Sequence, residues 1–184
     1  MLIDIDPYLV RPGSSVDLTA IDTRSTGSYR DGKESGKSLR RAMTRRLSDL
    51  QEIFYADGRH RLLVVLQATD TGGKDGTIKR VFRGVNPAGV RMAAFKQPTQ
   101  HELARDYLWR VHRQVPQDGE MTIFNRSHYE DVLIVRVKRL VPAAVWERRY
   151  AHINDFERLL ADEGTTIVKI FLHISKDEQA ERLQ

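Results

Sequence analysis

The feature that most constrains how this chain can fold is a continuous apolar run, Leu62 to Leu66, followed directly by a glycine-rich turn. Apolar runs of this length are typical of strands buried on both faces of a parallel sheet. Further strands are expected at residues 90–95, 121–124 and 166–173, and stretches with helical periodicity separate them. This alternation predicts an α/β fold in which helices cover both faces of a parallel sheet of about four strands.

The intervening segments carry helix signals of two kinds. Apolar residues recur at helical spacing, and Thr99 with Glu102 has the spacing of a capping box, which predicts one helix from there to Pro116. The other expected helices run through residues 39–57, from within 67–77 to 85, through 129–137, through 143–161, and from the cap Ser175 onward.

Residues 1–35 differ in composition from the rest of the chain. They are rich in Pro, Gly, Ser, Thr and Asp, and no helical or strand period is sustained there. We therefore expect an extended N-terminal arm over residues 1–35 and a single folded domain over residues 36–184.

Composition excludes several classes of protein. Cysteine is absent, so disulfides, thiolate metal sites and cysteine nucleophiles are all excluded. No apolar run approaches the roughly 18 residues needed to span a bilayer. The first residues include Asp4 and Asp6 where a secretory signal would have bases. We expect a cytoplasmic protein without a membrane partner.

A net charge of +5 indicates an anionic partner without naming it. Residues 37–46 contain five bases and no acid, and apolar residues repeat through them at helical spacing. That segment reads as one amphipathic helix with a solvated basic face. A nucleic-acid partner would rest on the high pI alone, because no nucleic-acid motif is present, and we expect none.

A phosphate site is expected in the turn after the first strand, Asp70-Thr-Gly-Gly-Lys74. Glycines let backbone amides approach a phosphate, a helix N-terminus favours negative charge, and Lys74 adds a cation. The regular P-loop pattern is G-x-x-x-x-G-K-[ST], from which this chain departs at Ala68 and Asp75. A plain strand-to-helix turn would contain similar residues, but Asp70 and the bases that follow favour phosphate. The phosphate-binding candidates here are Gly72, Gly73, Lys74, Asp75, Gly76, Thr77, Lys79, Arg80 and Arg83.

A second candidate loop follows the third expected strand and begins Asn125-Arg126. Polar residues at this strand tip commonly face the metal ion in P-loop enzymes. Asn125 is a neutral acceptor there, which cannot hold Mg²⁺ through charge. Arg126 could place its guanidinium on transferred phosphate oxygens. An arginine at a strand end is also a common structural residue, and both interpretations stay open at this point.

Taken together, the two loops make the sequence resemble the polyphosphate kinase 2 family. The resemblance covers about Tyr8 to the C-terminus and is carried by residues 70–80, 86–90, 96–99, 106–110 and 124–132. It implies a P-loop kinase-like α/β/α fold and phosphoryl transfer between inorganic polyphosphate and a nucleotide, with Mg²⁺. It also implies a homo-oligomer, either a dimer or a tetramer. The Asn125 form of the second motif resembles the branch that accepts nucleoside monophosphates as well as diphosphates, so AMP and ADP/ATP are the expected nucleotides.

The resemblance also assigns roles to residues. Asp70 would hold Mg²⁺ and orient the acceptor, Lys74 and the amides of residues 73–77 would cradle phosphate, and Arg126 would stabilise the transferred group. Family members continue past Gln184 into a lid that supplies arginines, so we expect an incomplete domain and a missing lid. Two alternatives are a lidless, catalytically weak fragment that binds polyphosphate or nucleotide, and an ATP-dependent nucleoside monophosphate kinase.

Overall fold

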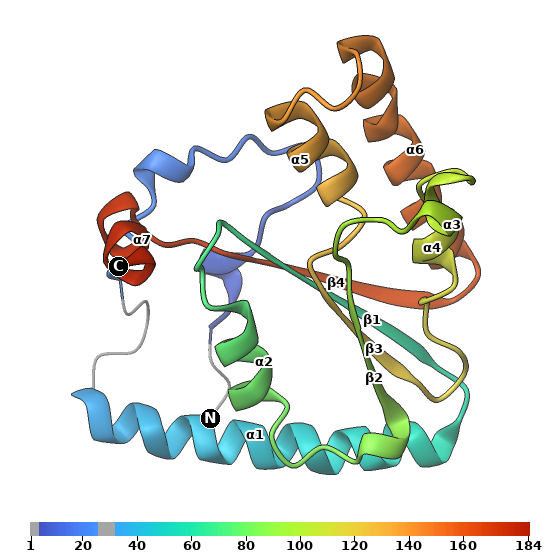
Figure 1. The fold of residues 1–184 in the computed structure, drawn as a ribbon. Coiled ribbons are helices and arrows are strands. Elements are labelled where there is room, and N and C mark those ends of the chain that lie inside the picture. Colours follow the sequence, from blue (N-terminus) through green and yellow to red (C-terminus); the bar gives the residue numbers. More distant parts are fainter. Residues whose placement is uncertain (1–3, 26–31) are drawn as a thin grey trace.

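One parallel sheet organises the molecule (Figure 1). The structure, a computed structural model, describes residues 4–25 and 32–184, with the backbone alone at 32–35. The sheet has the order β2-β3-β1-β4, and every neighbouring pair of strands is parallel. Its strands are β1 (Arg61–Ala68), β2 (Val90–Ala94), β3 (Met121–Asn125) and β4 (Thr165–Leu172). The predicted α/β fold with four strands is confirmed.

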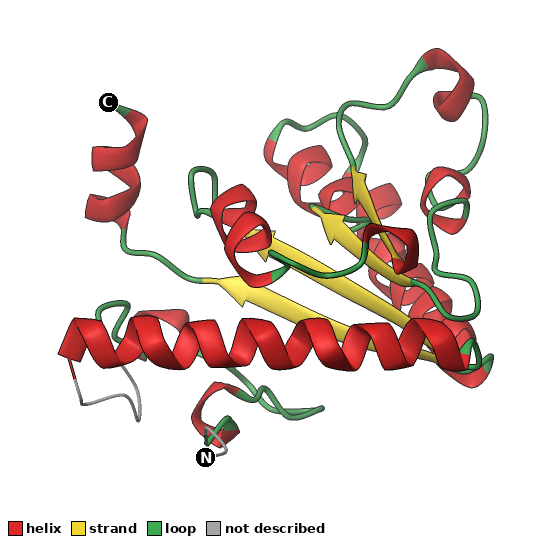
Figure 2. Ribbon diagram, turned by 90° about the horizontal axis from the view of Figure 1, so that it is seen from below, coloured by secondary structure: helices red, strands yellow, loops and turns green. Residues whose placement is uncertain are grey.

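Helices connect the strands, and the long α1 lies across one face of the sheet (Figure 2). The helices are α1 (Gly32–Asp57), α2 (Lys74–Val81), α3 (Gln100–Leu103), α4 (Trp109–His112), α5 (Glu130–Val137), α6 (Ala143–Asp162) and α7 (Lys176–Leu183). Short 3₁₀ turns occur at Asp6–Tyr8, Leu18–Ala20 and Pro87–Gly89. Among residues 4–25 and 32–184, no helix has the length and apolar character that a membrane span requires.

The core consists of two apolar clusters, one on each face of the sheet. Side chains alternate along a strand, so Leu63 and Val65 of β1 face one cluster while Val64 and Leu66 face the other. The first cluster is completed by α4 and α6 residues such as Val111 and Phe156, and the second by α1 and α2 residues such as Leu47 and Ile78. The predicted three-layer arrangement is therefore confirmed.

The prediction of a single helix from residue 99 to Pro116 is wrong. The capping box is present, since Thr99 Oγ1 accepts from the Glu102 amide at 3.3 Å, but α3 ends after one turn. A second helix, α4, then begins because Asp106 Oδ1 accepts from the amides of Leu108 and Trp109, both at 3.0 Å. An aspartate side chain that binds amides two and three residues ahead starts a new helix instead of continuing an old one.

The other helices begin and end close to the predicted residues, except for the end of α2 and the start of α1. α2 ends at Val81, earlier than expected, and Gly84 follows with a left-handed φ of +93°. α1 already begins at Gly32, so it crosses the boundary predicted at residue 36. Within the predicted arm, residues 4–25 contain only two 3₁₀ turns as regular structure. The ring of His173, just after β4, lies 3.0 Å from the Leu18 carbonyl. The arm's residues 1–3 and 26–31 lie outside the described residues.

Candidate functional site

The register of three adjacent strands brings the predicted loops together. Asn125, the last residue of β3, lies beside Leu66 of β1 and Ala94 of β2. The Arg126 amide donates to the Leu66 carbonyl at 3.2 Å, and the Phe95 amide donates to the Asn125 carbonyl at 3.4 Å. The loops after β1, β2 and β3 therefore converge at the carboxyl edge of the sheet, where open α/β sheets bind ligands.

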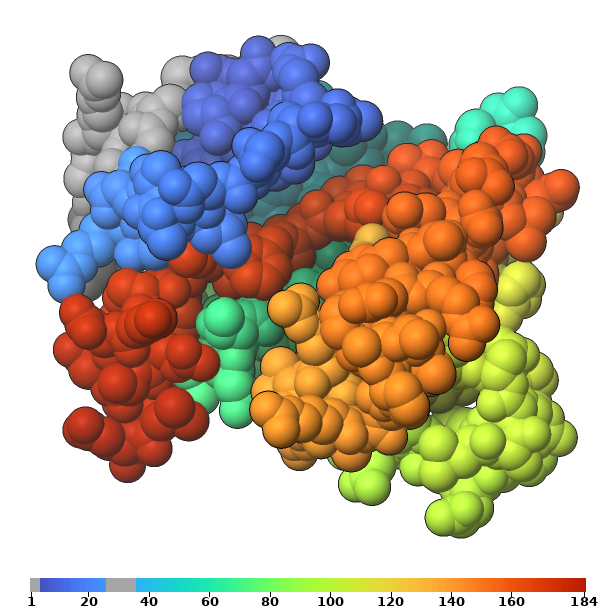
Figure 3. Space-filling view, turned by 90° about the horizontal axis from the view of Figure 1, so that it is seen from above, coloured from blue at the N-terminus to red at the C-terminus, as the bar shows by residue number. Residues whose placement is uncertain are grey.

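A pocket of about 630 Å³ lies between these loops. Figure 3 shows the loop after β1, in green, between α7 in red and the α5–α6 region in orange. Eight of the predicted site residues line the pocket: Asp70, Gly72, Gly73, Lys74, Asp75, Gly76, Asn125 and Arg126. The remaining four, Thr77, Lys79, Arg80 and Arg83, lie on or just after α2 and do not line it.

Backbone geometry explains both glycines of the loop after β1. Gly73 caps α2 with a left-handed φ of +88°, which favours glycine. A Cβ on Gly72 would lie 2.5 Å from Ala68 Cβ, so the loop folds back too closely for any side chain. Ala68, which replaces the first glycine of the regular P-loop, is itself the residue against which the loop closes. The loop thus keeps its amides near the pocket without the regular motif.

The N-terminus of α2 supplies fewer free amides than the sequence indicated. The Thr77 amide donates to the Gly73 carbonyl at 2.9 Å, so it is already paired inside the helix and its expected role as a phosphate donor stays a prediction. Only the first amides of a helix lack an intrahelical acceptor, and here they belong to residues 74–76. The hydroxyl of Thr77 remains a candidate.

Charges of both signs face the pocket. Arg126, which adopts a left-handed φ of +63°, lies with Nη2 3.6 Å from Asp70 Oδ1, and both side chains are exposed. Asn125 Nδ2 donates to Asp75 Oδ1 at 2.5 Å, which joins the two loops directly. Within the described part of the chain, no carboxylate pairs with the ammonium of Lys74 or of Lys96. These two cations are available to an anionic ligand.

The structure adds residues that the sequence analysis did not select. Lys96 and Gln97 line the pocket from the loop after β2, and their position at a strand end was the available signal. From α7, Gln179 Nε2 donates to the Asp70 carbonyl at 2.9 Å, and Arg182 Nη1 donates to the Thr71 carbonyl at 3.1 Å. No local sequence signal indicates these contacts, because more than 100 residues separate the partners.

Behind the second loop, the carboxylate of Glu157 on α6 contacts three hydrogen-bond donors. Its carboxylate lies 3.1 Å from His128 Nε2, accepts from the Tyr129 hydroxyl at 2.7 Å, and accepts from Lys169 Nζ at 2.7 Å. Burial alone would raise the pKa of Glu157, but these hydrogen bonds outweigh burial and lower the pKa from 4.5 to about 2. Because His128 and Tyr129 follow Arg126 closely, Glu157 holds the second loop against α6 and β4.

This low pKa predicts how stability depends on acid. The Glu157 pKa is lower in the folded than in the unfolded state, so its contribution is complete above about pH 4.5 and is lost as pH falls toward about 2. We expect Glu157→Gln to lower the melting temperature most above pH 5, with the gap to wild type closing in acid. Thermal melts followed by circular dichroism test this, with the exposed α6 variant Glu147→Gln as control. A gap that stays constant from pH 7 to pH 3 would contradict the assignment.

Comparison with known proteins shows to which family this chain belongs. The family model for polyphosphate kinase 2 matches residues 30–184, which include all of the pocket-lining loops. The chain belongs to the polyphosphate kinase 2 family. The resemblance inferred from the two loop motifs is confirmed.

Individual relatives agree with this family assignment. The chain is 62% identical over 177 residues to the AMP/ADP-polyphosphate phosphotransferase of Meiothermus ruber, and the match covers 96% of this chain and 66% of that protein. It is 43% identical to the ADP-polyphosphate phosphotransferase of Rhodopseudomonas palustris, covering 99% of this chain and 67% of the relative. The crystal structure of polyphosphate kinase 2 from Arthrobacter aurescens TC1 superposes with a TM-score of 0.89 at 50% identity, covering 94% of this chain and 62% of that one. The chain thus spans about two thirds of the length of these relatives.

The pocket of this polyphosphate kinase 2 chain has a donor set that suits Mg²⁺. Asp70, Asp75 and Asn125 place carboxylate and amide oxygens on its wall, and Mg²⁺ prefers oxygen ligands. Among the described residues, no three acidic, histidine or cysteine side chains cluster closely enough to hold an ion by themselves. One or two carboxylates together with substrate phosphates are the usual way in which proteins bind Mg²⁺. The residues present therefore fit the ion.

The short contact between Asn125 and Asp75 makes Asn125→Asp informative. The substitution replaces an amide donor, 2.5 Å from Asp75 Oδ1, with a second carboxylate. Like charges this close cannot both ionise unless a cation joins them, so we expect tighter Mg²⁺ binding. Because the Asn125 form of the motif resembles the branch that accepts nucleoside monophosphates, we also expect a lower ratio of AMP to ADP phosphorylation. Calorimetry with Mg²⁺ and the two initial rates measure these effects. Gln97→Glu adds a charge to the same pocket from another loop and is the control, and an unchanged AMP-to-ADP ratio would remove Asn125 from acceptor choice.

Proposed function

We propose that this chain transfers a phosphoryl group between inorganic polyphosphate and a nucleoside mono- or diphosphate, with AMP and ADP as acceptors. The observation that carries the proposal is the pocket at the carboxyl edge of β1, β2 and β3, where three cations and two carboxylates face one cavity. Relatives named AMP/ADP-polyphosphate and ADP-polyphosphate phosphotransferase support the choice of substrates. Both substrates carry condensed or terminal phosphates, which require this concentration of positive charge.

Phosphoryl transfer demands positioning and charge neutralisation more than covalent chemistry. In the proposal, Lys74 and the amides of residues 74–76 bind the phosphate that lies over the N-terminus of α2. Arg126 stabilises charge on the transferred group, and Asp70, 3.6 Å away, restrains its guanidinium before substrate arrives. The acceptor phosphate is largely ionised at neutral pH, since its second pKa is near 6, so no general base is required.

Asp70 is the residue we assign to Mg²⁺, with Asp75 and Asn125 beside it. The Asp70 side chain is 73% exposed, so its carboxylate is accessible to an ion. The bond from Gln179 to its backbone carbonyl holds the residue at the pocket wall. When bound, Mg²⁺ would neutralise negative charge on the donor and acceptor phosphates.

The exposed cations of α2 extend the proposed site beyond the pocket. Lys79 and Arg83 are four residues apart, and Arg80 is exposed near them. Lys79 and Arg80 also lie in the last turn of α2, where cations stabilise a helix by themselves. We assign these three residues to the part of a polyphosphate chain that leaves the pocket, because a repeating anion needs repeated cations.

Supplying polyphosphate as the sole phosphoryl donor tests the proposal. We expect AMP to be converted to ADP, and ADP to ATP, in reactions that contain polyphosphate and Mg²⁺ and no other donor. Product formed from ATP and AMP but not from polyphosphate would overturn the proposal in favour of an ATP-dependent nucleoside monophosphate kinase. Binding of polyphosphate without transfer from either donor would favour a binding fragment.

Two further expectations stay predictions. Light scattering on the purified protein would test the dimer or tetramer, and cell fractionation would test the cytoplasmic location.

A further inference from the structure

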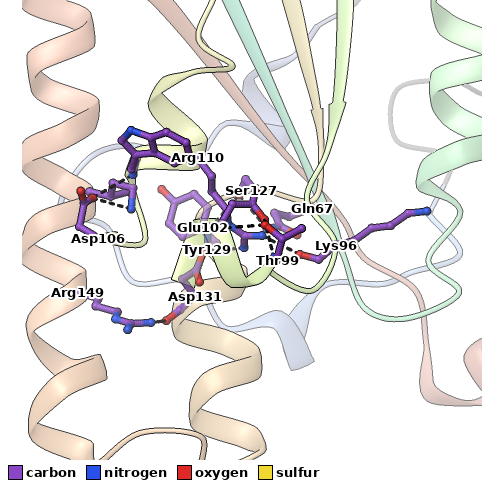
Figure 4. A network of polar contacts seen from close by, with 12 residues as sticks. Gln67, Lys96, Thr99, Glu102, Asp106, Arg110, Ser127, Tyr129, Asp131 and Arg149 are labelled. Atoms are coloured by element: carbon purple, nitrogen blue, oxygen red, sulfur yellow. Dashed lines mark hydrogen bonds and ion pairs between the residues drawn. The ribbon is translucent and has the colours of Figure 1, made fainter. Parts of the chain in front are cut away.

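Lys96 is a pocket cation to which neither the regular P-loop pattern nor the second motif assigns a role. It follows β2 directly and lines the pocket from the wall formed by the loop after β2, whereas Lys74 lies at the N-terminus of α2. Figure 4 shows its side chain extending away from Arg110, out of the polar network behind it. Within the described residues it has no carboxylate partner.

The loop that carries Lys96 is fixed at both ends. Its Lys96 carbonyl accepts from Arg110 Nη1 at 2.8 Å, and its last residue, Thr99, is held by Glu102 through the capping box. Pro98, between them, has a restricted φ. A cation on so short and restrained a segment loses little conformational freedom when an anion binds, which favours affinity.

Arg110, which anchors the loop through its bond to the Lys96 carbonyl, is buried, and a buried anchor of this kind is unusual. Its side chain is 7% exposed, its Nη2 lies 3.2 Å from Asp131 Oδ2, and its guanidinium lies over the Phe95 ring at 5.6 Å. Asp131 is in the first turn of α5, directly after the loop that carries Arg126. One buried guanidinium thus joins the loop of Lys96 to Asp131 of α5 (Figure 4).

We propose that Lys96 binds a terminal phosphate of the substrate on the β2 side of the pocket, and that Arg110 is a positioning residue for Lys96. The proposal rests on the proposed function, because transfer places two anionic substrates end to end in one pocket. A cation at the N-terminus of α2 serves one of them, and Lys96 serves the phosphate that approaches along the wall after β2. The anchor fixes the backbone of Lys96, so its side chain starts from a fixed position on the pocket wall before substrate arrives.

Calorimetric binding of tripolyphosphate and of AMP, each alone, tests the role of Lys96. We expect Lys96→Ala to weaken one of these two ligands by about tenfold or more, and more at low salt, because the interaction is with a charged group. Which ligand is affected shows whether Lys96 serves donor or acceptor. Lys96→Arg keeps the charge and is expected to retain most of the affinity. The control is Lys138→Ala, which removes an exposed lysine that follows α5 and lines no part of the pocket.

A double-mutant cycle tests the role of Arg110. Arg110→Lys keeps a buried cation for Asp131 but loses the planar fork that reaches the Lys96 carbonyl. We expect it to weaken the same ligand in the wild-type background and to have no further effect on binding in Lys96→Ala, while lowering the melting temperature equally in both. A merely structural Arg110 would weaken binding in both backgrounds.

The outcomes separate this proposal from the proposed function. Unchanged binding of both ligands by Lys96→Ala would overturn the role of Lys96, even in a protein that transfers phosphate from polyphosphate normally. Absence of transfer by the wild-type protein would overturn the proposed function, while the binding data would still decide whether Lys96 holds phosphate.

Discussion

Lys74→Ala is expected to lower kcat/KM by about a hundred- to a thousandfold while the protein stays folded. The charge of Lys74 is the one that the N-terminal amides of α2 cannot replace, since they contribute partial dipoles only. Its ammonium has no carboxylate partner among the described residues, and alanine is a good residue for the first position of a helix. The free energy of unfolding should therefore change by no more than about 0.5 kcal/mol.

Lys176→Ala is the matched control for Lys74→Ala. Lys176 is the first residue of α7, as Lys74 is the first residue of α2, but it lines no part of the pocket. Steady-state rates with polyphosphate as donor and thermal melts on both variants separate catalysis from stability. Turnover by Lys74→Ala equal to that of Lys176→Ala would show that the loop after β1 is an ordinary strand-to-helix turn.

The parts of the fold that the sequence predicted are those with local causes. The run Leu62–Leu66 is apolar on both faces because both faces of β1 are covered, and the capping box at Thr99 needs only residues three apart. The loops after the first and third strands were likewise located before any contact was known, because parallel strands end at one edge of the sheet, where ligands bind.

The parts that sequence reasoning missed depend on competition or on distance. The helix expected to reach Pro116 is interrupted because the Asp106 side chain competes for amides that a continuous helix would have used. The contacts of Gln179 and Arg182 with the loop after β1 join residues 109 and 111 positions apart, and nothing local distinguishes these side chains from others on an exposed helix. The bond from Arg110 to the Lys96 carbonyl was missed for a related reason, since any residue has a backbone carbonyl and the sequence does not indicate which one accepts.

Asp70→Asn is expected to change metal-dependent turnover and metal-free phosphate binding in opposite directions. Asparagine has nearly the same shape, and the Gln179 contact is to the backbone carbonyl, so the loop keeps its conformation. The substitution removes the charge that we assign to Mg²⁺, and turnover should fall by about a hundredfold or more at a fixed Mg²⁺ concentration. It also releases Arg126, now 3.6 Å from a carboxylate, so tripolyphosphate should bind more tightly when Mg²⁺ is chelated.

Because turnover is expected to fall while metal-free binding of tripolyphosphate is expected to tighten, the experiment tests the role of Asp70 directly. A general loss of structure would weaken both properties, whereas loss of the ion alone would weaken only the first. Asp155→Asn is the control, because Asp155 is also an exposed carboxylate paired with an arginine, Arg158 at 2.8 Å, and lies on α6 away from the pocket. Mg²⁺ titrations of turnover, with calorimetry of tripolyphosphate in EDTA, measure the two effects. If the Mg²⁺ dependence of Asp70→Asn matches that of Asp155→Asn, the ion is held elsewhere, and Asp70 serves only to restrain Arg126.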